Sequence, residues 1–265
     1  MLEFTVPVVE VTRLPFALTE TSVLGIIPAR YQSSRLPGKA LLDLAGRPMI
    51  EHVYRRAAQA RLLDALVVAT DDERIAQAVD AFGGIACLTA AHHPSGTDRL
   101  AEVAASTRCG LVVNVQGDEP LMDPAVINTA VAPLLDNPAI EMGTAARRLR
   151  PTEELANSHL VKVVRDADGR ALYFSRAPIP FSRDAAGLAL ARIHVGLYVY
   201  RRDTLLRLAA LAPSPLELAE ALEQLRALEH GIRIHVADTD YVSFEVNTPD
   251  DLAHVRQHLL AATHG

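Results

Sequence analysis

The sequence predicts an α/β fold with a doubly wound, mostly parallel sheet and an inserted antiparallel segment. Short apolar runs alternate with amphipathic helical stretches as far as about residue 135, which is typical of a doubly wound parallel sheet. Strand-like runs joined by a hairpin signal then follow. With 265 residues and 49% hydrophobic content, the chain suits one large domain. We therefore expect an N-terminal extension at 1–22 and a single domain at 23–265, with an insert at about 142–192.

The first half is expected to hold four strands, each leading to a helix. The apolar runs that predict these strands are 23–27, 66–69, 85–88 and 111–115. The helices are expected to begin at Pro48, after a cap at Asp71, around Leu100, and after Asp123-Pro124. Residues 1–21 precede the first clear element and form either an extra strand or a loose arm.

The second half has more strands in sequence and contains the expected insert. Its strand-like runs are 142–149, 161–164, 171–174, 193–200 and 233–237. Asp168-Gly169 is a hairpin signal, and the antiparallel insert is a candidate dimerisation arm. A capping box at 214–217 starts a leucine-faced helix expected to continue to Gly231. Thr248-Pro249 starts the last helix, whose apolar face carries Leu252, Val255 and Leu259.

The bulk composition excludes several classes of protein. A net charge of −6 and a pI of about 5.9 disfavour a protein that coats nucleic acid. No apolar run has the length of a membrane span, and the N-terminus does not resemble a signal peptide. Cys87 and Cys109 are expected to be reduced, buried thiols. We therefore expect a cytoplasmic enzyme with no nucleic-acid or membrane partner.

The first polar cluster follows the first predicted strand. Its loop holds Arg30, Arg35 and Lys39 together with Ser33 and Ser34. Charge alone favours a solvated surface loop. Because ligands of parallel sheets bind at the carboxyl ends of the strands, this position favours a polyphosphate.

Two further clusters follow later strands. Asp118, within Gln116–Pro120, is a natural magnesium ligand because Mg²⁺ takes one or two carboxylates together with phosphate oxygens. A helix cap is the alternative, although Asp123 already serves that purpose. Asn247 lies in the third cluster and is either a turn residue or a neutral oxygen ligand. Ser95 and Gly96 begin a helix, where they either cap it or receive a base edge or phosphate.

Two neighbouring histidines suggest a metal site at first sight. No third ligand lies at a suitable spacing from His92 and His93, so a solvated pair is expected instead.

Together these stretches resemble the family of CMP-Kdo synthetases, the 3-deoxy-manno-octulosonate cytidylyltransferases. The resemblance covers roughly residues 23 to 260 in consistent order. The stretches that carry it are IIPARYQSSRLPGKAL, ATDDERIAQAV, HPSGTDRLAE, VNVQGDEP, VKVVRDADGRALYFSRAPIP, HVGLYVYRR, PSPLELAEALEQLRALEHG and VNTPDDL.

The resemblance implies an activity and a set of site residues. The reaction would be CTP plus Kdo giving CMP-Kdo and pyrophosphate, with Mg²⁺, in lipopolysaccharide biosynthesis, and the enzyme would be a homodimer. Arg30, Arg35 and Lys39 would hold the triphosphate, and Asp118 and Asn247 the metal. The remaining nucleotide-binding residues would be Ala29, Asp71, Ser95, Gly96 and Gln116. The positions associated with the sugar acid are Arg176, His194, Tyr198, Glu223 and Gln224; an exposed helix face is the other interpretation of the last two.

Asn247 departs from the family pattern, in which an aspartate that binds magnesium usually precedes Thr-Pro. The resemblance therefore supports cytidylyl transfer more firmly than it supports Kdo as the acceptor. The alternatives are a cytidylyltransferase for another acid, such as 8-amino-Kdo, another ulosonate or a phosphonate, and a catalytically weak nucleotide-binding homologue. The retained residues Arg30, Arg35, Lys39 and Asp118 speak against the last alternative.

Overall fold

The fold was analysed in a computed structural model, which describes residues 9–10, 14–32, 36–184, 187 and 189–263. Contacts within the chain divide it into two compact units. The first comprises Met1–Pro124 and Ser243–Gly265, and the second comprises Ala125–Val242. The predicted single domain with an insert at about 142–192 stays a prediction.

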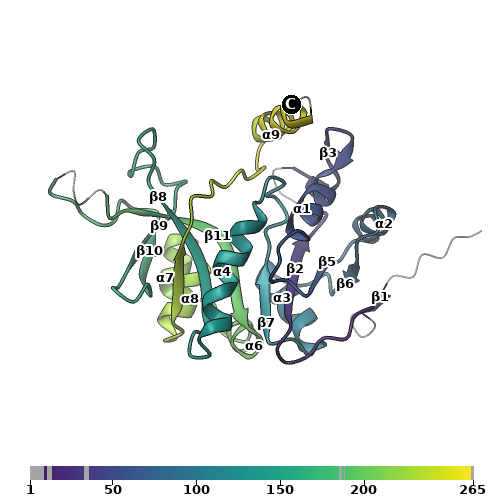
Figure 1. Cartoon of the computed structure of the whole chain (residues 1–265), viewed down its shortest axis with the longest axis horizontal. Coiled ribbons are helices and arrows are strands. Elements are labelled where there is room, and N and C mark those ends of the chain that lie inside the picture. The colour runs from purple at the N-terminus through teal and green to yellow at the C-terminus, as the bar shows by residue number, and fades with distance from the viewer. Residues whose placement is uncertain (1–8, 11–13, 33–35, 185–186, 188, 264–265) are drawn as a thin grey trace, which may run out of the picture. The chain divides into compact units, whose positions relative to one another are not determined.

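The first unit is built on a parallel sheet with strand order β1-β6-β5-β2-β7 (Figure 1). These strands are β1 (Val9–Glu10), β2 (Val23–Ala29), β5 (Ala65–Thr70), β6 (Ala86–Leu88) and β7 (Leu111–Asn114). Strands β5 and β6 follow β2 on one side, and β7 then pairs with β2 on its other side. The direction of winding therefore reverses between β2 and β7, which is where open α/β sheets bind ligands.

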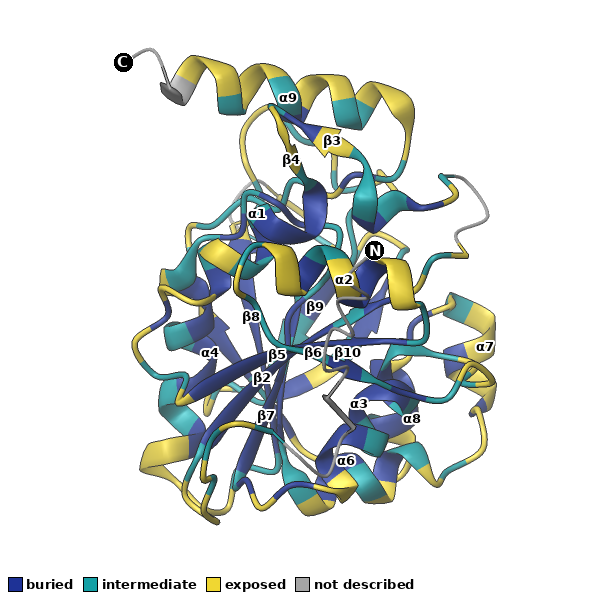
Figure 2. Cartoon of the chain, turned by 90° about the vertical axis from the view of Figure 1, so that its right-hand side faces the viewer, coloured by how far each residue is buried: buried dark blue, intermediate teal, exposed yellow. Residues whose placement is uncertain are grey.

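Helices follow these strands as the sequence predicts. In the first unit they are α1 (Met49–Ala57), α2 (Glu73–Ala81) and α3 (Gly96–Ala105). The helix that follows β7 in sequence, α4 (Pro124–Asp136), belongs to the second unit apart from its first residue. Strands β2, β5 and β7 are almost wholly buried, and Figure 2 shows them in dark blue. Both cysteines are buried and free, and burial raises the pKa of the Cys87 thiol to about 12. The expected reduced, buried thiols are confirmed.

The loop after β2 contains short elements that the sequence did not reveal. They are a 3-10 turn, η2 (Lys39–Leu41), and a two-stranded hairpin of β3 (Asp43–Leu44) and β4 (Arg47–Pro48). The hairpin turns at Ala45 and Gly46, which both have positive φ, as a tight turn between antiparallel strands requires.

The C-terminal helix α9 (Pro249–Thr263) packs on this hairpin region. Its predicted apolar face is confirmed, because Val255 is buried and Leu252 and Leu259 pack against a cluster that includes Leu44 and Val246. The helix otherwise presents mostly exposed residues (Figure 2).

The second unit has a mixed sheet. In it β11 (Arg192–Arg201) pairs antiparallel with β8 (Met142–Arg148), and β12 (Ile234–Asp238) pairs parallel with the other edge of β8. The strands β9 (Lys162–Arg165) and β10 (Ala171–Ser175) form an antiparallel hairpin, and β9 also pairs with β11. The predicted turn at Asp168-Gly169 joins them, and Gly169 has φ 79. A helix that was not predicted, α6 (Arg202–Ala209), follows β11.

The leucine-faced helix is one place where the prediction was wrong. The capping box at Ser214 is present, but the helix is broken into α7 (Pro215–Glu220) and α8 (Gln224–Glu229). Ala221 adopts the left-handed conformation with φ 52 and ends α7. Arg226 in α8 donates from Nε to Glu217 in α7 at 2.7 Å, so a buried ion pair holds the two short helices together.

Among the described residues, no helix has the length and apolar character that a membrane crossing requires. Both units combine strands and helices, and the predicted α/β fold class is confirmed.

Candidate active site

The first predicted site residues gather around the carboxyl end of β2. Ala29 ends this strand and Arg30 follows it as an exposed residue. A Cβ atom added at Gly117 would lie 2.8 Å from the carbonyl oxygen of Pro28, and one at Gly96 would lie 3.5 Å from Pro28 Cγ. The start of α3 and the loop after β7 therefore both approach the end of β2. Only glycine at position 117 allows that approach.

Lys39, Asp118 and Asn247 meet in this same unit. The Lys39 ammonium contacts Asp118 Oδ2 at 2.7 Å and donates to Asn247 Oδ1 at 3.2 Å. The side chains of Lys39 and Asp118 are 14% and 28% exposed, so the pair is partly desolvated yet reachable. Two oxygen atoms from distant segments thus converge on one positive charge.

Backbone contacts hold these segments in place. The amide of Val246 donates to the carbonyl of Asp118 at 2.9 Å, which fixes the last motif beside the loop after β7. The amides of Asn247 and Thr248 both donate to Asp251 Oδ2, at 2.9 and 2.8 Å, and Thr248 Oγ1 accepts from the Asp251 amide. Thr248 therefore caps α9, as predicted, and Asn247 stands just outside the helix.

Glu245 belongs to this cluster; it begins the third polar stretch of the sequence but was not predicted as a site residue. Its Oε2 accepts a hydrogen bond from Asn247 Nδ2 at 2.9 Å. Packing of protein around the carboxyl group and then the charge of Asp118 raise the pKa of Glu245, although the residue as a whole stays exposed. It lies two positions before Asn247, and only its charge within an otherwise apolar segment could have drawn attention to it.

Asp71 does not cap α2, so that prediction was wrong. The cap is Asp72, whose Oδ1 accepts from the Arg74 amide at 3.0 Å. Asp71 instead faces the buried Arg99, whose guanidinium lies 3.4 Å from Asp71 Oδ1. Burial lowers the pKa of Arg99, Asp71 raises it, and the charge of Arg30 lowers it further. Arg99 was also missed, and it brings a second guanidinium near Arg30.

Ser95 and Gly96 start α3 as predicted. Ser95 Oγ accepts from the Asp98 amide at 3.2 Å and donates to the Asp98 carboxylate at 2.6 Å. Capping is thus one function of Ser95, and binding of a base edge stays a prediction. Gln116 lies after β7 and is partly exposed.

Arg35, together with Ser33 and Ser34, lies outside the described residues. The expected solvated histidine pair is only half correct, because His92 is exposed whereas His93 contacts Glu102.

In the second unit, a β-bulge in β11 brings His194 and Tyr198 together. The register with β8 shifts between Val195 and Tyr198, and the rings of His194 and Tyr198 lie 5.3 Å apart. Thr144 donates its hydroxyl to the Leu197 carbonyl at 2.7 Å, which satisfies a carbonyl of the bulge.

His194 is neutral at physiological pH. Its Nε2 lies 3.0 Å from Thr144 Oγ1, and because the hydroxyl hydrogen is used on Leu197, Nε2 carries the proton that completes this bond. Desolvation lowers the pKa of His194 to about 3. The ring therefore offers a neutral polar group, Nδ1, as an acceptor.

Arg176 is fixed by hydrogen bonds to Glu220, the last residue of α7. It donates from Nε to the Glu220 carbonyl at 2.9 Å, and its amide donates to Glu220 Oε2 at 2.9 Å. The buried Lys162 donates to the carbonyls of Asn157 and Arg176. Glu220 and Lys162 were missed in the sequence. The position of Lys162 as the one charged residue in the run VKVV is the only signal that it carries.

Glu223 and Gln224 lie at the break between α7 and α8. Gln224 is 4% exposed, and no hydrogen-bond partner for its Nε2 is present among the described residues. A buried amide without a partner is costly. The expected alternative of an exposed helix face is therefore wrong for Gln224.

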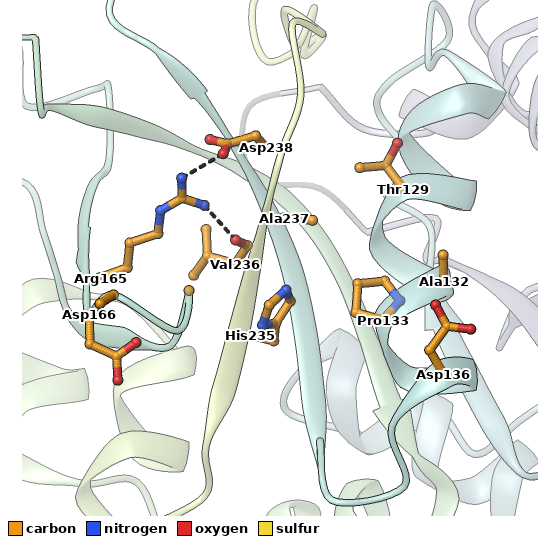
Figure 3. Close-up of a pocket in the computed structure, with 12 residues that line it drawn as sticks. Thr129, Ala132, Pro133, Asp136, Arg165, Asp166, His235, Val236, Ala237 and Asp238 are labelled. Atoms are coloured by element: carbon orange, nitrogen blue, oxygen red, sulfur yellow. Dashed lines mark hydrogen bonds and ion pairs between the residues drawn. The ribbon is translucent and has the colours of Figure 1, made fainter.

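A separate groove in the second unit lies between α4, the β9–β10 turn and β12 (Figure 3). On the side of the groove away from α4, Arg165 donates to the Val236 carbonyl at 2.8 Å and contacts Asp238 at 2.5 Å (Figure 3). None of the predicted site residues that the structure describes lines this groove.

The donor set in the first unit fits a divalent cation such as Mg²⁺. Asp118 and Asn247 supply hard oxygen atoms, and both oxygens contact the Lys39 ammonium, which is itself a positive charge. No group of three or more His, Cys, Asp or Glu that could hold a metal occurs within the described part of the chain. Two protein ligands suit Mg²⁺ that shares its coordination with substrate phosphate.

The fold and this site define a nucleotidyltransferase, and comparison with known proteins is more specific. The cytidylyltransferase family model matches residues 24–234. A 3-deoxy-manno-octulosonate cytidylyltransferase of Geobacter sulfurreducens is 54% identical, over 90% of this chain and 99% of its own length. One of Pelobacter propionicus is 52% identical, over 91% and 98%. The chain belongs to the cytidylyltransferase family and, within it, to the 3-deoxy-manno-octulosonate cytidylyltransferases.

Solved structures agree with this assignment. A CMP-2-keto-3-deoxy-manno-octonic acid synthetase complexed with CTP superimposes with a TM-score of 0.87 at 44% identity, covering 91% of this chain and 100% of that one. The 4-diphosphocytidyl-2C-methyl-D-erythritol synthase of Anaerococcus prevotii shares the fold, with a TM-score of 0.61 at 12% identity over 91% and 97%. The predicted family and enzyme class are confirmed. Enzymes of this class generally use a divalent metal ion.

Proposed function

We propose that the chain transfers the cytidylyl group of CTP to Kdo, giving CMP-Kdo and pyrophosphate. Relatives named for this activity at 52–54% identity, matched over about nine-tenths of the chain, support the proposal. The observation that carries it is the convergence of Lys39, Asp118 and Asn247. In this arrangement the Lys39 ammonium and two oxygen atoms that could bind a metal lie in the first unit, in whose sheet the direction of winding reverses between β2 and β7.

The triphosphate is bound at the end of β2. Arg30 is exposed there, and Lys39 and Arg35 complete the cationic set. Ala29, Ser95, Gly96, Gln116 and Asp71 line the nucleoside part. Guanidinium and ammonium groups neutralise phosphate oxygens and stabilise the leaving pyrophosphate. Arg99 adds a fixed positive charge near Arg30.

The acid is bound by residues of the second unit. His194 and Tyr198 offer neutral polar groups at the bulge of β11. Gln224 offers an amide whose Nε2 has no hydrogen-bond acceptor within the described part of the chain. Arg176 and Glu223 supply one charge of each sign. A fixed set of this kind orients a hydroxyl for in-line attack on the α-phosphorus, which is catalysis mainly by positioning.

Asp118 and Asn247 hold Mg²⁺ in this proposal. When bound, the ion would neutralise phosphate charge and lower the pKa of the attacking hydroxyl, so that no dedicated general base is required. Lys39 exchanges its contacts with these two oxygens for contacts with the nucleotide phosphates.

We also propose that the protein is a cytoplasmic homodimer. Three large apolar side chains in the region 142–192 are exposed, with Leu172 at 61%, Phe181 at 89% and Leu190 at 69%. Exposed apolar side chains that gather in one segment are typical of an interaction surface. CTP is a cytoplasmic nucleotide, which supports the location.

A pyrophosphate-release assay tests the proposal. The purified protein is given CTP and Mg²⁺ with a panel of acids that includes Kdo, 8-amino-Kdo, a second ulosonate and a phosphonate. Kdo should give the highest kcat/KM. A higher kcat/KM with another acid would retain cytidylyl transfer and change the acceptor, and no release with any acid would indicate a nucleotide-binding homologue without this activity.

A further inference from the structure

The amide of Asn247 has a definite orientation in this structure. A carboxylate accepts hydrogen bonds and donates none when ionised. Because Asn247 Nδ2 donates to Glu245 Oε2 at 2.9 Å, the opposite end of the amide, Oδ1, faces the Lys39 ammonium at 3.2 Å. Rotation of the amide by half a turn would place an NH₂ group against a cation and an oxygen against a carboxylate.

The charges around this point are also informative. Asp118 contacts the ammonium at 2.7 Å, and Asn247 brings an oxygen without charge. Glu245 lies one hydrogen bond behind that oxygen, near enough for the charge of Asp118 to act on it. Two carboxylates thus act on the cation through side-chain contacts, Asp118 directly and Glu245 through the Asn247 amide. The Asp251 carboxylate is also close enough to interact with Lys39, but it is bound to the backbone amide of Asn247 rather than to its side chain. A negative charge behind the amide increases the electron density on its oxygen.

We propose that Glu245 is a positioning residue for the divalent cation: its carboxylate fixes the Asn247 amide with the oxygen toward the cation and supplies the negative charge that the amide lacks. This inference rests on the proposed function, in which Asp118 and Asn247 are the metal ligands. It makes Glu245 and Asn247 a coupled pair, whose contributions to cation binding are not additive.

A double-mutant cycle tests the coupling without turnover. The variants are Glu245→Gln, Asn247→Asp and the double variant, with Asp250→Asn as a control that removes an exposed carboxylate from the same region. Mn²⁺ is the probe, and free Mn²⁺ is measured by electron paramagnetic resonance in the absence of CTP and of any acid. Circular dichroism and thermal unfolding establish that each variant is folded.

The effect of Glu245→Gln on Mn²⁺ affinity should depend on whether residue 247 is Asn or Asp. In the wild-type background, Glu245→Gln should weaken Mn²⁺ binding about tenfold, because it removes a charge and allows the amide to turn. In the Asn247→Asp background, the loss should be no more than about twofold, because both oxygens of a carboxylate can face the cation. Asp250→Asn should change the affinity less than about twofold because solvent screens an exposed charge.

Equal losses in the two backgrounds would overturn the inference, as would unchanged Mn²⁺ binding in Glu245→Gln or no Mn²⁺ binding by the wild type. Because no substrate is present, these outcomes are distinguishable from failure of the proposed transfer reaction, which the pyrophosphate assay measures independently.

Discussion

Asp118 follows the end of a strand and contacts Lys39 directly. It contributes little to the hydrophobic core. Its side chain is 28% exposed, and its distance to the Lys39 ammonium is 2.7 Å. Asp118→Asn keeps the volume and removes the charge. We expect kcat to fall by at least about 10³-fold, since a metal ligand contributes several kcal/mol in the transition state.

The fold should tolerate this change, and its thermal midpoint should shift by no more than a few degrees. Asp80→Asn, at an exposed position of α2, is the matched control and should retain full activity. Steady-state pyrophosphate release measures both variants. Activity of Asp118→Asn within tenfold of wild type would exclude its role as a ligand.

His194 predicts a pH dependence of stability. Its pKa of about 3 in the folded chain lies below the ordinary value of 6.5, so the unfolded chain binds more protons between these two values. Stability that is present above pH 6.5 is therefore lost as the pH falls through this window. His194→Gln has no titrating group, and its amide can still donate to Thr144.

The measurement is urea unfolding of wild type and His194→Gln at pH 7 and pH 5. Between these pH values the wild type should lose about 2 kcal/mol more of its free energy of unfolding than the variant. Identical losses would mean that His194 has an ordinary pKa in the folded chain.

At the scale of elements, the break between α7 and α8 determines the positions of Glu223 and Gln224 at the start of α8. It depends on Ala221, whose φ of 52 is costly for a residue with a Cβ. Ala221→Gly should therefore increase the free energy of unfolding by about 0.5–1 kcal/mol, after the entropic cost of glycine is included.

The same substitution should have the opposite effect on stability two residues earlier. Ala219 is an exposed residue within α7, and Ala219→Gly should cost about 1 kcal/mol because glycine is a poor helix former. Chemical denaturation of both variants gives the comparison. A destabilised Ala221→Gly would show that the left-handed conformation at this residue is wrong.

The elements show why part of the structure was predictable. Alternating apolar runs predicted the four parallel strands and their helices because each run obeys a local period. The break at Ala221 was not predicted, because the leucine spacing continues through it and alanine gives no sign of positive φ. Asp72 rather than Asp71 caps α2, an error of one residue that neighbouring aspartates make easy.

The site residues likewise divide into those that a local sequence pattern predicts and those that it does not. Asp118 was found because a polar loop directly follows a buried strand. Lys39, which contacts both Asp118 and Asn247, is 208 positions from Asn247. The resemblance to a family, rather than any local pattern, predicted that these residues act together. Arg99 was missed because its partner Asp71 lies 28 positions earlier in the sequence. The contacts of Glu245 with Asn247 and of Lys162 with the carbonyls of Asn157 and Arg176 are closer in sequence, but they depend on side-chain orientations that no sequence pattern indicates.

At the scale of the whole molecule, the exposed side chains of Leu172, Phe181 and Leu190 predict self-association. Light scattering coupled to size-exclusion chromatography should give the wild type twice the chain mass of 28.6 kDa. Leu172→Ser with Phe181→Ser should give the mass of one chain, because the apolar area that drives association is removed. Leu260→Ser, at an exposed position of α9, is the control and should not change the mass. A wild-type mass of 28.6 kDa would contradict the dimer.

The central claim is that the first unit binds CTP and that its cytidylyl group is transferred to an acid. The most direct measurement is identification of the product by mass spectrometry after incubation with Mg²⁺, Kdo and either CTP, ATP or GTP. We expect CMP-Kdo from CTP and no product after chelation of the metal. The purine nucleotides should give little product, because a site that hydrogen-bonds the edge of one base leaves its polar groups unpaired when another base is bound. Equal product formation with ATP, or formation of CMP-Kdo in the presence of excess chelator, would contradict the account.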